Sequence, residues 1–356
     1  MSNPDSTPNP ELPLARLLDL YRTMVRIRAF ENAAEIASQG GVSAYGQSAG
    51  TRAEVRGPLH LSTGQEAVPT GVCAHLRRDD FITSTHRGHG HTLAKGADMV
   101  RMMAELFGKA SGCNGGKGGS MHIADFSVGM LGANGVVAAG LPIAVGAAQA
   151  QKLKQLTQSA QGLAAENAIT VCFFGDGAIN RGPFLEALNW ARVYALPVLF
   201  VCEDNRWSAT TASTTMTAGP GASARALSLD IAATQVDGND VLEVFDAAQA
   251  LVQQVRAGQG PRLLHALTYR VKGHVSVDAA AYRDPQELAA ALQTDPIARF
   301  REQFVALGHD ALALDALENE AAAEVDAAQA AARAAPWPAP ETAFTDVQTT
   351  GAGTWY

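Results

Sequence analysis

The chain has 356 residues, of which 47% are hydrophobic, and a formal net charge of -8 at pH 7. This length and apolar content suffice for one large or two ordinary domains with a sizeable core. The acidic balance, without a long basic run, argues against nucleic acid or an anionic membrane surface as a partner. No apolar run reaches the roughly 18 residues that a membrane-spanning helix needs, so we expect no membrane segment.

The start of the chain and its cysteines bear on the compartment. Residues 1–13 are polar and rich in proline, and we expect a disordered lead rather than a secretory signal. The four cysteines are scattered and form no CxxC pair, which favours buried, reduced thiols. Together these features predict a cytoplasmic protein.

Hydrophobic periodicity predicts the elements of the first part of the chain. We expect a helix over 14–38, a polar loop over 39–57, a capped helix within 62–76, a short strand over 81–85 and a helix over 97–108. The glycine-rich stretch SGCNGGKGGS at 111–120 is expected to be flexible and to become ordered only when something binds.

From residue 132 the pattern alternates between helices and strands. Helices are predicted over 136–155, 183–194 and 240–257, strands over 168–174, 197–203 and 262–271, and a small-residue loop over 206–227. Residues 286–335 are predicted to be helical, and PWPAP at 336–340 ends this region. The alternation predicts one α/β domain over 14–335, with a parallel sheet covered by helices on both faces and helical N- and C-terminal segments. Residues 336–356 are left as a tail.

Acidic and amide side chains follow two of the predicted strands where each strand ends. Gly175, Asp176 and Gly177 follow the first strand, and Asn205 follows the next one. A right-handed crossover places such strands side by side or nearly so, so these side chains should project over the same end of the sheet. Carboxylate and amide oxygens suit Mg²⁺, which completes its coordination with phosphate oxygens and water. Each motif alone is more often an ordinary turn, but the pair predicts a site for a metal-diphosphate.

The same stretch, GDGAIN followed by EDNRW, resembles the thiamine diphosphate motif. The segments HLSTGQEAVPTG, TSTHRGHGHTLAKGAD, GKGGSMHIAD, GMLGANGVV and TYRVKGHVSVDAAAYRDP then occur in the order typical of one family. This family is the alpha subunit of the decarboxylating component of 2-oxo acid dehydrogenase complexes, which includes pyruvate, branched-chain 2-oxo acid and acetoin dehydrogenases. The resemblance runs from about residue 14 to 335 and implies the thiamine diphosphate-binding fold.

The resemblance implies a magnesium site and a phosphate site. Asp176, the side chain of Asn205 and the backbone carbonyl of Trp207 would hold Mg²⁺. The family usually has tyrosine at position 207, a change that a carbonyl ligand tolerates. The backbone N–H groups of Gly177 and Ala178 would meet the diphosphate, and Gly175 would let the chain turn tightly beside them.

Four more positions match residues that bind the cofactor in this family. His86 and Arg87 match a Tyr-Arg pair on the same phosphates, and the forked guanidinium group suits that role. The Gly135 carbonyl would accept a hydrogen bond from the aminopyrimidine. Val137 would be the apolar prop that bends the cofactor.

Two histidines match family positions close to the reaction, His274 in the active-site loop and His89 nearer the cofactor. We expect both to be catalytic, because histidine titrates near neutrality and can stabilise an intermediate or move protons. A rival interpretation takes His86, His89 and His91 as a zinc site, although three ligands so close in sequence rarely suffice without a distant fourth. The remaining histidines are interpreted as structural, with one of them, His122, near the entrance of the site: His60, His75, His122, His265 and His309.

The resemblance also implies partners. Thiamine diphosphate needs a carboxylate against its pyrimidine ring, and in the family a separate beta chain supplies it. We therefore expect an α₂β₂ heterotetramer that passes an acyl unit to a lipoyl-bearing acyltransferase component. The small-molecule substrate stays open between pyruvate, a related 2-oxo acid and acetoin. A transketolase-like half-subunit for ketol transfer and a non-catalytic assembly subunit are the alternative functions.

Two further departures from the family concern surface segments. Val275 stands where animal members carry a regulatory serine, so phosphorylation at that position is not expected. The loop at 41–56 is longer than the usual connection.

Overall fold

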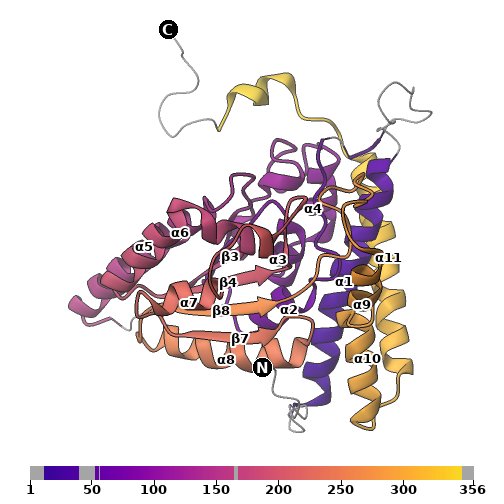
Figure 1. The fold of residues 1–356 in the computed structure, drawn as a ribbon. Helices are drawn as coiled ribbons and strands as arrows, with labels where there is room; N and C mark the ends of the chain where they lie inside the picture. Colours follow the sequence, from indigo (N-terminus) through magenta and orange to yellow (C-terminus); the bar gives the residue numbers. More distant parts are fainter. Residues whose placement is uncertain (1–11, 40–52, 56, 164–166, 347–356) are drawn as a thin grey trace.

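The computed structural model describes residues 12–39, 53–55, 57–163 and 167–346. Its centre is a six-stranded sheet with the order β2-β1-β3-β4-β8-β7, in which every neighbouring pair is parallel (Figure 1). The strands of this sheet are β1 Phe81–Thr83, β2 Met130–Gly132, β3 Thr170–Gly175, β4 Val198–Asp204, β7 Ala233–Asp237 and β8 Arg262–Leu267. A small antiparallel hairpin pairs β5 Trp207–Ser208 with β6 Thr211–Ala212.

Helices cover both faces of the sheet, so the α/β architecture predicted from the sequence is confirmed. One side of the sheet carries α5 Gly140–Ala160, α6 Gly182–Val193 and α7 Ala222–Leu227. The other carries α2 Ala67–Cys73, α3 Gly88–Ala94, α4 Met99–Leu106 and α8 Val241–Arg256. Three helices lie together beyond the sheet on the right of Figure 1, with α9 Pro285–Leu292 beside them: α1 Leu14–Gln39, α10 Pro296–Ala306 and α11 Leu312–Ala334. Short 3₁₀ turns are η1 Ser120–His122, η2 Phe126–Val128, η3 Asp176–Asn180, η4 Ser213–Thr215 and η5 Pro340–Phe344.

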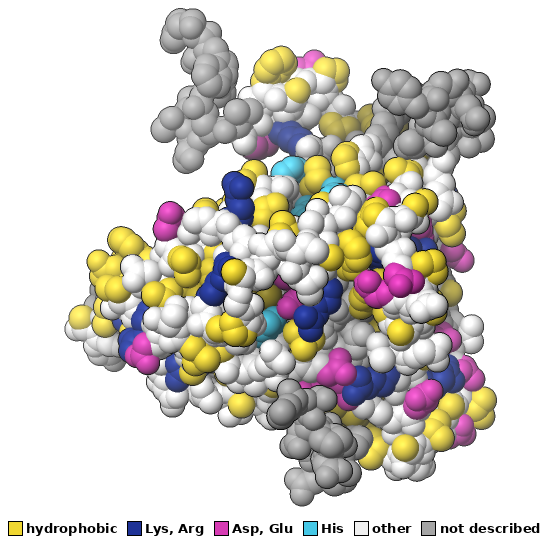
Figure 2. Space-filling model, in the orientation of Figure 1, with side chains coloured by type: hydrophobic (Ala, Val, Ile, Leu, Met, Phe, Trp, Pro, Cys, Tyr) yellow, Lys and Arg dark blue, Asp and Glu magenta, His cyan; other side chains and the backbone are white. Residues whose placement is uncertain are grey.

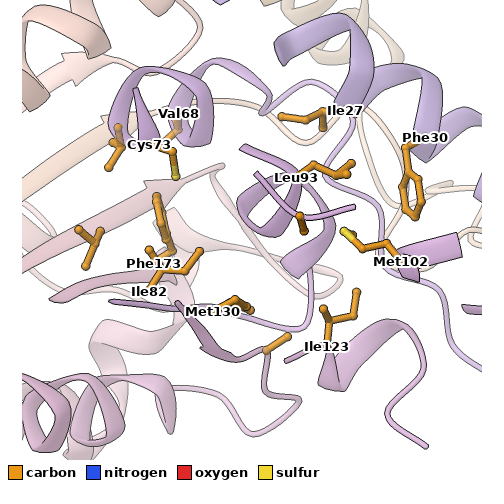
Figure 3. Close-up of a cluster of buried hydrophobic side chains, with 14 of the residues drawn as sticks. Ile27, Phe30, Val68, Cys73, Ile82, Leu93, Met102, Ile123, Met130 and Phe173 are labelled. Atoms are coloured by element: carbon orange, nitrogen blue, oxygen red, sulfur yellow. The ribbon is translucent and has the colours of Figure 1, made fainter. Parts of the chain in front are cut away.

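The two central strands are apolar throughout because their side chains alternate between two buried layers. Val171 and Phe173 of β3 belong to the core on the α8 side, whereas Cys172 and Phe174 belong to the core on the α5 side. Figure 3 shows part of the first core, in which Phe173 and Ile82 from the sheet lie beside helical side chains such as Leu93. Residues that point to opposite faces at every step must all be apolar when both faces are covered, which explains the continuous run TVCFF.

The boundaries of most predicted elements agree with the structure, but six helices and strands were missed. The region 206–227, predicted as a loop, contains the β5–β6 hairpin and α7. The edge strand β7 was missed because Ala233, Thr234 and Gln235 are not buried and give no apolar run. The others are β2, only three residues long, and α3, which contains two glycines and is held by packing rather than by helix propensity.

The glycine-rich stretch 111–120 is also corrected, because it has a defined conformation organised by one buried carboxylate. Glu105 of α4 is fully buried and accepts four backbone N–H bonds, at 2.7 and 2.9 Å from Asn114 and Gly116 and at 2.8 and 3.0 Å from Gly118 and Gly119. A side chain on Gly112 would place its Cβ 2.3 Å from this carboxylate, so glycine is required there. The loop is therefore ordered from within the chain.

The ends of the chain fall partly outside the described residues. This applies to residues 1–11 of the expected lead, to 40–52 and 56 of the 41–56 loop, and to 347–356 of the tail. The described part of the tail contacts the glycine-rich stretch and the residue before it, since Lys117 donates to the Thr345 carbonyl and Ala110 donates to the Pro336 carbonyl. None of the described helices has the length and apolar character needed to cross a bilayer.

We predict that Glu105→Gln destabilises the chain, because the amide replaces one acceptor oxygen with a donor that faces N–H groups. Leaving buried donors unpaired should lower the free energy of unfolding by about 3 kcal/mol. Urea unfolding followed by circular dichroism measures the change. Glu302→Gln, at an exposed position of α10, is the matched control and should stay within about 0.5 kcal/mol of the parent. Equal unfolding midpoints for the two variants would contradict this role of Glu105.

Candidate active site

The carboxyl ends of four neighbouring strands meet at one edge of the sheet and deliver the polar residues of the site. His86 and Arg87 follow β1, Asp176 follows β3, Asn205 follows β4 and Arg270 follows β8. The register pairs Gly175 with Glu203, so β3 and β4 end side by side as predicted. A cavity of about 220 Å³ lies there, and all five of these residues line it. In an open parallel sheet this edge is where ligands bind.

Asp176 and Asn205 are both buried in the wall of this cavity. The Asp176 carboxylate accepts a hydrogen bond from the Ser213 hydroxyl. The Asn205 side chain is oriented at both ends, because its amide donates to Gln65 at 2.9 Å and its oxygen accepts from the Trp207 N–H at 3.1 Å. Burial, with Asp204 nearby, raises the pKa of Asp176 to about 7. A cation bound here would stabilise the charged carboxylate and lower this pKa again.

Trp207 fixes the turn that follows Asn205. Its indole N–H donates to Glu287 of α9 at 2.7 Å, and the guanidinium group of Arg283 lies 5.3 Å from the centre of its ring. Next to it, Arg206 has a φ of 67° and Ala209 a φ of 51°, a left-handed conformation that is uncommon outside glycine. Such backbone conformations cluster at functional sites, where the surrounding structure holds them in place.

Arg87 and Arg270 are buried cations without a carboxylate partner among the described residues. Arg87 donates to the carbonyls of Leu61 at 2.7 Å and His274 at 2.9 Å, and Arg270 donates to the Ala209 carbonyl at 2.9 Å. Burial, reinforced by Arg270, lowers the pKa of Arg87 to about 9, and burial lowers that of Arg270 to about 10. Buried charges are normally paired, so this pair of guanidinium groups indicates that the cavity binds an anion.

The predicted histidines His86 and His274 line the same cavity, and His60 joins them. The ring centres of His60 and His86 are 4.5 Å apart, and those of His60 and His274 are 4.8 Å apart. His274 also lies against Arg87, whose guanidinium nitrogen is 3.2 Å from its Nδ1 atom. His60 was interpreted from the sequence as structural, and the structure places it in the wall of the cavity.

The zinc site suggested for His86, His89 and His91 does not form, because the last two have other partners. His89 is fully buried, with Nδ1 2.9 Å from Glu31 and Nε2 3.0 Å from Ser120. His91 lies 3.0 Å from Glu203 through Nε2 and 2.7 Å from Ser84 through Nδ1. His89 does not line the cavity, so it stands behind the wall rather than at the reacting centre.

The remaining predicted positions all line the cavity: Gly135, Val137, Gly175, Gly177 and Ala178. A side chain on Gly177 would place its Cβ 2.4 Å from the Ser208 hydroxyl, so the hairpin β5–β6 leaves room for nothing larger. Val137 is 47% exposed and its neighbour Val136 is 65% exposed, which puts two apolar side chains at the open side of the cavity. The space-filling view shows histidine at only a few places on its face of the molecule, as expected for buried imidazoles (Figure 2).

Comparison with known proteins identifies the family. The profile of the Dehydrogenase E1 component family matches residues 46–341. The chain belongs to this family. It is 39% identical to the alpha subunit of acetoin:2,6-dichlorophenolindophenol oxidoreductase from Bacillus subtilis (strain 168), over 93% of both chains. It is 41% identical to the same subunit from Cupriavidus necator, over 94% of this chain and 96% of the relative. The alpha subunit of the pyruvate dehydrogenase E1 component from Porphyra purpurea is 39% identical over 82% of this chain and 80% of that relative.

Membership of the E1 family implies thiamine diphosphate, and the cavity fits such a group. The unpaired cations Arg87 and Arg270 match a diphosphate, and the oxygens of Asp176 and Asn205 match the hard cation that accompanies it. In addition, the buried Nε2 of His86 and Nδ1 of His60 have no hydrogen-bond partner within the described structure. Unpaired buried polar atoms indicate that something absent from the chain itself completes the site.

Two residues of the site were missed by sequence reasoning although they stand in quoted motifs. Arg270 lies in TYRVKGH and His60 in HLSTGQ. The signal for Arg270 was its position directly after an apolar strand, at the edge where Asp176 and Asn205 were already expected. No comparable signal marked His60, because only the tertiary structure brings the segment before α2 next to β1.

We predict that acid destabilises the chain through the buried histidines of the cavity. Burial, with Arg87 as the second cause, lowers the pKa of His86 to about 2, that of His60 to about 3 and that of His274 to about 4. The unfolded chain therefore binds more protons below about pH 6.5, the ordinary histidine pKa. The stability that these neutral imidazoles contribute is complete above that pH and is lost progressively as the pH falls toward the folded-state pKa values of about 4 to about 2.

His86→Gln removes one of these groups, so its stability should depend less on pH. Between about pH 7.5 and pH 5 the loss of unfolding free energy should shrink by up to about 2 kcal/mol relative to the parent. Urea unfolding at the two pH values measures this difference. His122→Gln, on the surface, is the matched control and should behave as the parent does. An unchanged pH dependence in His86→Gln would refute the prediction.

Proposed function

We propose that this chain is the alpha subunit of a thiamine diphosphate- and Mg²⁺-dependent dehydrogenase that cleaves pyruvate, a related 2-oxo acid or acetoin. The observation that carries the proposal is the pair of buried guanidinium groups of Arg87 and Arg270, which form no ion pair with a carboxylate of the described residues. They face the cavity that also holds Asp176 and Asn205. A diphosphate with its magnesium ion satisfies both features at once, since phosphate oxygens bind the cations and the metal binds the carboxylate and amide oxygens.

Each part of the cofactor has candidate residues in the cavity. Asp176, the Asn205 side-chain oxygen and the Trp207 carbonyl would hold Mg²⁺. Arg87 and His86, with the N–H groups of Gly177 and Ala178, would hold the diphosphate. Gly135 and Val137, on the segment that leads into α5, would meet the pyrimidine ring. Because this backbone has a fixed conformation in the folded chain, little ordering remains to be done when the cofactor binds.

His274 is the residue of this chain that we assign to the chemistry itself. Its ring lines the cavity beside Arg87, and its low pKa keeps it neutral at physiological pH. A neutral imidazole can accept or donate a proton at the substrate oxygen. His89 acts differently, as a positioning residue that ties α1 to the glycine-rich loop through Glu31 and Ser120. When bound, thiamine diphosphate supplies the electron sink that allows a carbon–carbon bond next to a carbonyl to break.

A second chain would complete the site. A cavity of about 220 Å³ is below the roughly 300–1,000 Å³ of typical small-molecule sites, so part of the cofactor would lie outside it. Exposed apolar side chains also gather over the region of α5 and α6 in Figure 2, where contact with a partner would bury them: Ile143, Leu153, Leu156, Leu185, Trp190, Val193 and Tyr194. We infer a beta subunit in an α₂β₂ heterotetramer that supplies the missing carboxylate, with a lipoyl-bearing acyltransferase component as acyl acceptor.

Among the substrates, acetoin is favoured. The Bacillus and Cupriavidus relatives, which this chain matches over almost their whole length, are named for acetoin. A pyruvate enzyme is the main competitor, since the Porphyra relative is named for pyruvate. None of these names points to ketol transfer, and the complete set of cavity residues gives no support to a subunit without catalysis.

We predict that Asp176→Asn abolishes Mg²⁺-dependent binding of thiamine diphosphate. Loss of a direct ligand should weaken cofactor affinity by more than the roughly 10–100-fold that loss of an outer partner costs. Titration calorimetry on the complex with the co-expressed beta chain measures this affinity. Asp326→Asn, on the exposed face of α11, is the control and should bind as the parent does. Equal affinities in the two variants would remove Asp176 from the metal site.

The substrate is tested on the same complex with dye reduction as the readout. Acetoin, pyruvate and a branched 2-oxo acid are supplied with and without Mg²⁺ and thiamine diphosphate. Turnover that needs both chains and both cofactors, and that is fastest with acetoin, is the expected result. Turnover of ketol donors alone would replace the dehydrogenase proposal with ketol transfer.

A further inference from the structure

The short helix α7 is connected to both turns that carry the predicted metal ligands. Arg225 of this helix reaches the turn that begins at Asp176. Ser223 reaches the turn that holds Asn205 through one intervening histidine. Neither Ser223 nor Arg225 lines the cavity. A role of these two residues would therefore be to position the site rather than to contact its ligand.

Arg225 fixes the far end of the turn that starts at Asp176. Its guanidinium group donates to the Ile179 carbonyl and, at 2.8 Å, to the side-chain oxygen of Asn180. Asn180 is held a second time, because its amide donates to the Thr217 hydroxyl at 2.8 Å. Asp176 and Asn180 are the first and last residues of η3, which has only five residues. A shift of the last residue therefore changes where Asp176 lies.

Ser223 acts through the buried imidazole of His265 on β8. His265 is 2% exposed, its Nδ1 atom lies 3.1 Å from the Ser223 hydroxyl, and its Nε2 atom lies 3.0 Å from the Asp204 carboxylate. An ionised carboxylate can only accept a hydrogen bond, so Nε2 carries the proton, and in the uncharged ring Nδ1 then accepts from the Ser223 hydroxyl. The chain of donors runs in one direction, from Ser223 to His265 to Asp204.

Asp204 holds the turn that carries Asn205 and Trp207. Its carboxylate accepts from the Arg206 backbone N–H at 3.2 Å, and its own carbonyl accepts from the Thr268 N–H at 2.9 Å. Arg206 has a φ of 67°, an uncommon conformation that needs support from its surroundings. The carboxylate supplies this support at the residue between the two predicted metal ligands of this turn.

Helix α7 is itself fixed to the sheet, so it can serve as a common reference for both turns. Ala222 is 1% exposed and Ala226 is fully buried, and both belong to the core on the α5 side of the sheet. Residues four apart lie on the same face of a helix, so these alanines pack inward together. Ser223 and Arg225 extend from this anchored helix to their partners.

The direct partners of the two ligands do not set the distance between the turns. Ser213 donates to the Asp176 carboxylate, and Gln65 accepts from the Asn205 amide. These partners lie in separate segments, one in η4 and the other before α2. Helix α7, by contrast, is linked to both turns.

We propose that Ser223 and Arg225 are positioning residues, which together set the separation of the two metal-binding turns and thus the affinity of the site for its divalent cation. This role rests on the proposed function, in which Asp176 and Asn205 bind Mg²⁺. The ion demands nearly octahedral coordination with bonds of about 2.0–2.1 Å, so a small displacement of one turn against the other weakens binding.

The test measures metal affinity on the complex of this chain with the co-expressed beta chain, in the presence of thiamine diphosphate. Mn²⁺ is the probe, because it takes the same oxygen ligands as Mg²⁺ and its free form gives an electron paramagnetic resonance signal that binding removes. Ser223→Ala and Arg225→Met should each weaken Mn²⁺ binding by roughly 10–100-fold, as loss of a partner behind a metal ligand does. Ser223→Thr keeps the hydroxyl and should bind as the parent does.

A matched control comes from the same helix. Ser228 lies at the end of α7, and its hydroxyl donates to the Arg225 carbonyl of the helix itself. Ser228→Ala should therefore keep the parent affinity. Circular dichroism and urea unfolding show which variants fold, and Ser223→Cys, with a weaker donor of similar size, replaces Ser223→Ala if that variant does not. A loss of stability without a loss of Mn²⁺ affinity would make Ser223 and Arg225 merely structural and overturn the proposal.

The same titration separates this positioning role from the proposed function. A parent complex that does not bind Mn²⁺ with thiamine diphosphate would remove the metal site at Asp176 and the positioning role with it. Tight binding by the parent, together with equally tight binding by Ser223→Ala and Arg225→Met, would overturn the positioning role alone. Weak binding by both Ser223→Ala and Ser223→Thr would also overturn it, because the hydroxyl would then not be the group that matters.

Discussion

Two buried guanidinium groups that form no ion pair with a carboxylate of the described residues dominate this structure. Arg87 and Arg270 lie at the carboxyl edge of the sheet and are bonded to backbone carbonyls rather than to carboxylates. A negatively charged ligand in the cavity would offset the cost of burying these two cations. The cavity and the carboxylate and amide oxygens of Asp176 and Asn205 lie beside these two cations.

The parallel sheet gathers these polar groups at one edge, outside its apolar interior. Strands β1, β3, β4 and β8 are buried on both faces and are mostly apolar, so most of the polar residues of the site follow the ends of these strands. Those ends point the same way, and each contributes one or two side chains to one cavity. The common direction of the strands thus determines where the cavity lies.

Two buried carboxylates outside the cavity, those of Glu31 and Glu105, hold its wall in place. Glu31 accepts hydrogen bonds from His89 and Ser62. Burial alone would raise the pKa of Glu31, but these partners keep that pKa below its ordinary value. Glu105 fixes the glycine-rich loop, whose last residue, Ser120, contacts His89. The loop, α1 and α3 are therefore connected through charged groups that never reach the cavity. Such networks are rigid because every unpaired member would be costly.

The sequence by itself determined the order of most elements, the parallel sheet and the pairing of Asp176 with Asn205. Apolar strands that alternate with amphipathic helices leave few arrangements, and strand direction then places both side chains at one edge. Family motifs supplied Arg87 and His274. Tertiary structure alone decided that His60 joins His86 and His274, that His89 turns away to Glu31, and that Glu105 orders a loop whose composition suggests flexibility. These contacts join residues far apart in the chain, and a local pattern carries no information about a partner that lies across the fold.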